Sequence, residues 1–242
     1  MLALTFFVTA VLYASVGFGG GSLYLAILSF FELPYQHIPV IALLCNLIVS
    51  GTGFLHYFWR GHFVSGLFLP FILGSVPLAY LGGRVSVSRD MFMLLLGVSL
   101  IAAGLRLLVL PREQTGKAKL QHWVWKGFAG GCLGFLSGLV GIGGGIFLSP
   151  LMLNLGWGRP KQIAATTSAF IFVNSLSGLL GQISKTGTNL ELSYWPLFLV
   201  VLVGGKIGAS CGSGQRLSQV VIKRATAILT LVAGGNLLLS CF

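Results

Sequence analysis

The chain contains very few acidic residues. Only four of its 242 residues are aspartate or glutamate, and charged residues of either sign make up 8% of the total. Soluble domains carry about 25% charged residues. A chain with so little charge and 55% hydrophobic residues cannot cover a water-facing surface, so we expect lipid to be the solvent for most of it. The composition excludes an ordinary soluble protein and predicts an all-α integral membrane protein.

Metal-binding and redox clusters are missing as well. The four cysteines lie in or beside apolar runs, with no C-x-x-C pair and no pairing with histidine. We interpret them as small buried residues and expect no metal and no other cofactor. A membrane enzyme or an assembly factor would need a nucleophile–base pair, a metal cluster or a soluble domain. The sequence shows none of these, so we do not expect an enzyme.

The excess of positive charge has a particular meaning in such a chain. A net charge of +11 would suggest a nucleic-acid partner for a soluble protein. Here the basic residues sit in short loops between apolar runs, where they set the orientation of membrane helices. We therefore expect contact with membrane lipid and no nucleic-acid partner.

Apolar runs long enough to cross a membrane are frequent. A span needs about 20 apolar residues, and six runs reach that length: 38–58, 64–83, 90–110, 163–183, 193–213 and 220–240. Two other regions are apolar but interrupted. Residues 2–14 and 22–31 are separated by a glycine-rich break, and residues 123–137 and 146–156 repeat that arrangement. The N-terminal run lacks the basic region of a signal peptide, so we expect it to belong to the fold.

The two breaks mark a duplicated unit. "VGFGGG" at 16–21 recurs as "VGIGGG" at 140–145, 124 positions later, and Pro70 recurs as Pro196, 126 positions later. Each half then consists of one glycine-broken element followed by three transmembrane helices, and duplicated membrane units are typical of transporters. We expect a first membrane repeat over 1–110, a basic cytoplasmic linker over 111–122 and a second membrane repeat over 123–242.

The basic residues of the loops favour two halves of opposite orientation. If each broken element dips into the bilayer and returns, eleven basic residues fall on the side of the central loop, and only Arg84, Arg89 and Lys185 fall on the other side. If each element crosses the bilayer, the same residues divide seven and seven. Because Lys and Arg concentrate in cytoplasmic loops, we expect inverted repeats, re-entrant breaks and a cytoplasmic central loop.

The glycines of the breaks predict an anion site. Unpaired backbone amides are costly in hydrocarbon, so a helix breaks at membrane depth only inside protein or beside a water-filled cavity. A new helix is expected to begin after each break, at about Ser22 and about Ile146. Its first amides carry partial positive charge, which suits an anion. Two repeats would bring two such helix starts together near the midplane.

Close helix packing is the alternative role for glycine in this chain. Two sets recur at four-residue spacing and are expected to be packing faces rather than sites: Gly130, Gly134 and Gly138, and Gly204, Gly208 and Gly212. A dinucleotide-binding fingerprint is disfavoured, because "GFGGGS" lacks the final glycine and no strand precedes it.

Polar residues within the spans complete the predicted site. Asn46 follows the first break, and Asn174 follows the second, near Thr166 and Thr167. Such groups either complete an oxoanion shell or bond neighbouring helices. Lys206 is the one basic residue well inside a span, where it either pairs with an anionic substrate or extends to the interface. The predicted substrate-binding residues are Gly19, Gly20, Gly21, Ser22, Asn46, Gly143, Gly144, Gly145, Thr166, Thr167, Asn174 and Lys206.

These motifs resemble those of a known family. "VGFGGGSLYLAIL" and "SGLVGIGGGIFLSPLML" begin the two halves, and "KQIAATTSAFIFVNSLSGLLG" follows the second. The chain resembles the TauE/SafE family of sulfite and organosulfur anion exporters over essentially its whole length. The first half departs from the pattern, with "PVIALLCN" in place of the Thr-Ser motif. The resemblance implies a carrier of small sulfur oxoanions in the bacterial inner membrane.

The sequence and the resemblance together predict a secondary transporter for sulfite, thiosulfate or a sulfonate, held by the helix starts of the two breaks. Proton- and sodium-coupled carriers often use buried carboxylates, which are scarce here, so we expect the anion gradient and the membrane potential to drive transport. An anion channel on the same scaffold is the alternative. A second copy of the chain, in a homodimer, is the one protein partner we consider.

Overall fold

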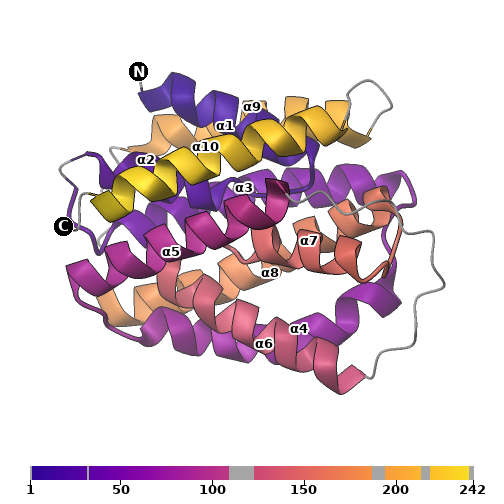
Figure 1. Cartoon of the computed structure of the whole chain (residues 1–242), viewed down its shortest axis with the longest axis horizontal. Coiled ribbons are helices and arrows are strands. Elements are labelled where there is room, and N and C mark those ends of the chain that lie inside the picture. The colour runs from indigo at the N-terminus through magenta and orange to yellow at the C-terminus, as the bar shows by residue number, and fades with distance from the viewer. Residues whose placement is uncertain (1, 32, 109–122, 187–193, 214–218, 240–242) are drawn as a thin grey trace.

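The computed structural model describes residues 2–31, 33–108, 123–186, 194–213 and 219–239. Over these residues the chain forms ten α-helices and no strand (Figure 1). The predicted linker over 111–122 lies outside the described residues. The helices of the first half are α1 (Leu2–Ser15), α2 (Gly21–Ser29), α3 (Ile38–Trp59), α4 (Ser65–Arg84) and α5 (Arg89–Leu108). Those of the second half are α6 (Trp123–Val140), α7 (Gly145–Asn154), α8 (Pro160–Thr186), α9 (Trp195–Ser213) and α10 (Gln219–Leu239).

Five of the described helices, α3, α4, α5, α8 and α9, are long and apolar enough to cross a membrane. They match five of the six predicted apolar runs. The sixth run is α10, whose described side chains form a shorter apolar helix, Arg224–Leu239. Large apolar side chains such as Leu73, Val98 and Phe128 are exposed on the outer faces of the helices. Lipid is the solvent that suits such a surface, and the chain is an integral membrane protein.

Glycine faces bring two pairs of helices into close contact. Each glycine of these faces lies against the backbone of the neighbouring helix: Gly204, Gly208 and Gly212 of α9 against α1, and Gly130, Gly134 and Gly138 of α6 against α4. Small residues allow such approach in membrane helices. The prediction that these two sets are packing faces is confirmed.

Replacing Gly134 with alanine is expected to push α6 away from α4 and to destabilise the protein. The added Cβ would lie 2.6 Å from the Cα and 2.7 Å from the Cβ of Ser75, and overpacking of this kind typically costs about 1–3 kcal/mol. Gly235→Ala on α10 is the matched control, because nothing lies within 4 Å of its added Cβ. Thermal unfolding in detergent should show a lower midpoint for Gly134→Ala only. Equal midpoints for the two variants would contradict the packing role.

The broken helix pairs each begin and finish at one end of the molecule. Successive glycines of α9 contact successive residues of α1, so these two helices run in the same direction, and α6 runs parallel to α4 by the same criterion. We call the end of the molecule where α3 begins and α8 ends the first end (left in Figure 1). Helix α1 begins at this end, and α2 finishes there. The chain enters α6 and leaves α7 at the opposite, second end. There Lys126 of α6 lies 4.9 Å from the ring centre of Trp157, between α7 and α8.

The helix starts of α2 and α7 therefore lie inside the molecule rather than at its ends. They flank α3 and α8, which pack against each other and are the most buried of the candidate spans. Each break consequently faces protein and not lipid, which is the condition for irregular backbone at membrane depth.

Candidate functional site

The first break ends in a helix start that a side chain closes. Gly20 precedes α2 with φ +86°, an angle that glycine adopts without strain. The amides of Leu23 and Tyr24 both donate to the Gly20 carbonyl at 3.0 Å. The amide of Gly21 donates to Oδ1 of Asn46 on α3 at 2.7 Å. The expectation of a free amide at this position is therefore wrong for this arrangement, because Asn46 supplies a buried acceptor.

The second break has a similar backbone shape but an open helix start. Gly144 precedes α7 with φ +74°, and the amides of Phe147 and Leu148 donate to its carbonyl at 3.2 Å. The amide of Gly145 is buried and has no hydrogen-bond partner among the described residues. A free amide at a helix start is a donor for an anion.

Asn46 joins the two breaks. Its Oδ1 accepts from the first break, and its Nδ2 donates to the carbonyl of Ile142 in the second break at 3.0 Å. A Cβ at Gly143 would lie 2.7 Å from Asn46 Nδ2. Cβ atoms at Gly19 and Gly143 would each lie 2.9 Å from Cγ2 of Ile171 on α8. The glycines thus let two breaks that are far apart in sequence meet between α3 and α8.

Polar groups of α8 lie beside the open helix start without partners. Cγ2 of Thr167 is 2.8 Å from the position of a Cβ at Gly145, and Oγ of Ser175 is 3.3 Å from that of a Cβ at Gly143. Four buried oxygens of α8 make no hydrogen bond among the described residues: the hydroxyls of Thr166, Thr167 and Ser175 and Oδ1 of Asn174. Unpaired buried polar groups are uncommon in proteins, so this cluster is a candidate place for a ligand.

Two members of this group were missed by the sequence prediction. Ile171 packs against glycines of both breaks, and the buried hydroxyl of Ser175 lies near Gly143 without a partner. Thr167, Ile171 and Ser175 recur at four-residue spacing, which places them on one face of α8. That spacing is the signal by which the sequence could have identified them.

Other predicted residues lie outside the unpaired cluster. Ser22 donates to the hydroxyl of Tyr13 at 3.3 Å, and Tyr13 contacts Thr230 of α10, so Ser22 belongs to the contacts among α1, α2 and α10. Lys206 is exposed on α9, and the structure does not bring it to the other predicted residues.

Two of the predicted glycines serve the backbone and its packing. A Cβ at Gly20 would lie 2.9 Å from the ring of Tyr24, and a Cβ at Gly144 would lie 3.0 Å from the ring of Phe170. Both glycines also have left-handed backbone angles, which other residues rarely adopt. They shape the two helix starts, and the side chains nearest to their Cβ positions are aromatic rings rather than the unpaired polar groups of α8.

The chemistry of this cluster is that of binding. Its groups are backbone amides, hydroxyls and carboxamides, which donate hydrogen bonds but do not activate a nucleophile. Over the described part of the chain, no group of three His, Cys, Asp or Glu side chains could hold a metal ion.

Comparisons with known proteins identify the kind of protein. The sequence profile of the family described as "Sulfite exporter TauE/SafE" matches residues 2–237. "Probable membrane transporter protein y4hK" of Sinorhizobium fredii (strain NBRC 101917 / NGR234) is 32% identical over 244 residues, which cover 98% of this chain and 97% of that protein. "Probable membrane transporter protein YunE" of Bacillus subtilis (strain 168) is 35% identical over 103 residues, 40% of this chain and 36% of that protein. No solved structure matches the chain. The chain belongs to the TauE/SafE family of membrane transporters and is not an enzyme.

Proposed function

We propose that the chain is a secondary transporter that moves a small sulfur-containing anion, such as sulfite, thiosulfate or a sulfonate, across the bacterial inner membrane. The description of the matched family as a sulfite exporter supports the substrate class. The observation that carries the binding site is the group of unpaired donors around the second break: the Gly145 amide and the hydroxyls of Thr167 and Ser175. An oxyanion accepts several charge-assisted hydrogen bonds at once, so an anion at the Gly145 amide would also accept from Thr167 beside it. Ser175 lies about two turns further along α8.

The start of α7 supplies positive potential to this proposed site. Aligned peptide dipoles place the equivalent of about half a positive charge at a helix start. The attraction of this charge for an anion is screened less in the buried surroundings than it would be in water. We leave Lys206 outside the site, because its side chain is exposed on α9. The anion would therefore be held by neutral donors, which permit release as well as binding.

The two asparagines support a proposal for how the site is emptied. Asn46 caps Gly21, whereas its counterpart Asn174 leaves Gly145 uncapped and donates at 2.9 Å only to the Phe170 carbonyl of its own helix. In the proposed cycle, Oδ1 of Asn174 accepts from the Gly145 amide when no anion is bound, as Asn46 does for Gly21. The arriving anion displaces that carboxamide and takes its place as the acceptor for the amide.

The proposal includes two inverted repeats with re-entrant breaks. In the two halves, α1 corresponds to α6, and α4 corresponds to α9. The first helix of each half packs along the fourth helix of the other half: α1 along α9, and α6 along α4. The return of α1–α2 to the first end and of α6–α7 to the second end supports the same arrangement. The three basic residues Arg84, Arg89 and Lys185 lie towards the first end, so we assign that end to the outside and the central loop to the cytoplasm.

Flux into liposomes tests the proposed function. The purified chain is reconstituted, and uptake of sulfite, thiosulfate, sulfoacetate and chloride is measured under an imposed membrane potential. We expect saturable uptake of at least one sulfur anion, well above that of chloride and of protein-free liposomes. The absence of flux for every sulfur oxoanion tested would contradict the proposal. Much faster flux without saturation would instead indicate an anion channel on the same scaffold.

A further inference from the structure

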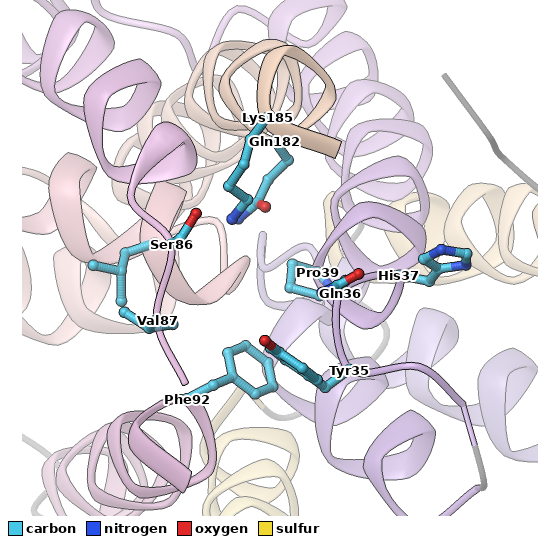
Figure 2. Close-up of a pocket in the computed structure, with 10 residues that line it drawn as sticks. Tyr35, Gln36, His37, Pro39, Ser86, Val87, Phe92, Gln182 and Lys185 are labelled. Atoms are coloured by element: carbon cyan, nitrogen blue, oxygen red, sulfur yellow. The ribbon is translucent and has the colours of Figure 1, made fainter. Parts of the chain in front are cut away.

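A cavity of about 500 Å³ opens at the first end of the molecule (Figure 2). None of the residues that line it belongs to the site proposed above. The wall consists of the α2–α3 connection with the start of α3, the α4–α5 connection with the start of α5, and the ends of α6 and α8. Sites for small organic molecules measure about 300–1,000 Å³, so the cavity has the size of a binding site for such a molecule.

One cation points into this cavity. Figure 2 shows Lys185 reaching in from the end of α8, whereas the His37 ring turns away from the centre. Nζ of Lys185 donates to the Val85 carbonyl at 3.2 Å. An ammonium has three N–H donors, so two remain. The only acidic side chain near this wall in the described part of the chain, Asp90, is exposed, and no Lys185 salt bridge links the two.

The cavity wall is mostly polar, and its smaller apolar part includes Phe92 and Leu139. Gln36, Ser86 and Lys185 are exposed, whereas Phe92 and Leu139 are buried. The hydroxyl of Tyr35 points into the space from the side opposite Lys185, next to the Phe92 ring (Figure 2). This arrangement offers donors for an anionic group at the mouth and apolar contact for a short carbon chain below.

The floor of the cavity adjoins the second break. Leu139 belongs to the last turn of α6, and Nε2 of Gln182 donates to the carbonyl of Gly138 in the same turn at 3.0 Å. A Cβ at Gly141, at the start of the break, would lie 3.0 Å from the Cα of Pro39. Gly141 is two residues from Gly143, which contacts Asn46. The cavity and the proposed anion site are thus separated by a short, glycine-rich stretch of backbone.

We infer that this cavity is an entry subsite for a small organic anion, in which Lys185 binds the anionic group and the wall around Phe92 contacts the carbon chain. The inference rests on the proposed function, because it supplies that transporter with a second site on the path from the first end. The ligand class is a short-chain organic sulfonate in preference to an inorganic sulfur anion. A bare oxoanion would leave most of about 500 Å³ to water and would not use the apolar floor.

The test replaces the cation and follows both binding and transport. Lys185→Met keeps the length of the side chain without its charge, and Lys185→Arg keeps the charge. Lys206→Met is the matched control, because it removes a lysine charge from α9 outside the cavity. The probe is 1-propanesulfonate, with sulfite for comparison. Saturation curves are recorded with the probe supplied at either end of oriented protein, together with thermal stabilisation by the probe in detergent.

We expect Lys185→Met to raise KM for 1-propanesulfonate supplied at the first end at least tenfold and to remove most of the thermal stabilisation by this probe. Lys185→Arg should keep most of the affinity, and Lys206→Met should match the native protein. Sulfite should respond less than propanesulfonate to the loss of Lys185.

The outcomes separate this inference from the proposed function. A protein that transports sulfur anions but shows the same KM and the same stabilisation in Lys185→Met and Lys206→Met overturns the subsite and leaves the function standing. The protein could instead transport no sulfur anion and yet be stabilised by propanesulfonate in its native form and as Lys185→Arg, but not as Lys185→Met. That result would overturn the proposed function and support the binding of an organic anion in this cavity.

Discussion

Replacing Asn46 with leucine, which has a similar volume, is expected to lower the free energy of unfolding by about 2–6 kcal/mol. The variant would leave the Gly21 amide and the Ile142 carbonyl buried without their present partner, and each unpaired buried group costs about 1–3 kcal/mol. The two breaks would also lose a side chain that bonds to both. Unfolding midpoints measured in detergent and the fraction of folded protein after purification report the loss.

Asn174→Leu is the matched control for this prediction. Asn174 is as deeply buried as Asn46. Within the described part of the chain, however, its side chain bonds only to the Phe170 carbonyl, one turn back on its own helix. We therefore expect Asn174→Leu to change the midpoint far less than Asn46→Leu. If the proposed exchange of caps is right, Asn174→Leu should nevertheless slow transport, because Gly145 would have no partner in the empty state. Equal loss of stability in both variants would show that the bridge made by Asn46 does not hold the breaks together.

Replacing Thr167 with valine is expected to weaken anion binding by roughly 10–150-fold without destabilising the protein. The change substitutes a methyl group for a hydroxyl that is buried and unpaired, so folding loses no hydrogen bond and sheds a desolvation cost. Binding of an anion would lose one hydrogen bond to a charged group, worth about 1.5–3 kcal/mol. Thermal stabilisation of the detergent-purified protein by sulfite or thiosulfate measures the affinity.

Thr226→Val is the matched control, because it shows the effect of removing a buried hydroxyl that lies outside the proposed anion site. Thr226 is also fully buried and its hydroxyl also lacks a partner, but it lies on α10, which packs mainly against α5. Both variants should keep or slightly raise the unfolding midpoint, and only Thr167→Val should lose anion affinity. Unchanged affinity in Thr167→Val would remove this hydroxyl from the site, and an equal loss in both variants would indicate an indirect effect.

The positions of the helices could be predicted because their causes are local. The apolar run at 38–58 became α3 (Ile38–Trp59), and the half-helices expected from about Ser22 and about Ile146 begin at Gly21 and Gly145. Apolar length sets where a membrane helix extends, and a glycine with a left-handed backbone angle sets where it stops and restarts. Both signals are contained in short stretches of sequence.

The contacts of the site could not be predicted in the same way. Asn46 and Ile142 are 96 residues apart, and nothing near either residue indicates that they bond. Its place within a span predicts Lys206 as a partner for an anion, but the rotation of α9 exposes it. That rotation is set by the glycine face of α9 against α1, and so by packing between helices rather than by position along one helix.

The sequence by itself determined that this protein is a helical membrane protein with two glycine-broken elements, because hydropathy and the backbone freedom of glycine act within a few turns of the chain. It also carried the family motifs that identify a transporter. Only the tertiary structure decided which helix start is capped and which is open. Gly21 meets an asparagine of α3 and Gly145 does not meet one of α8, because a cap depends on the acceptor that a distant helix brings to the amide.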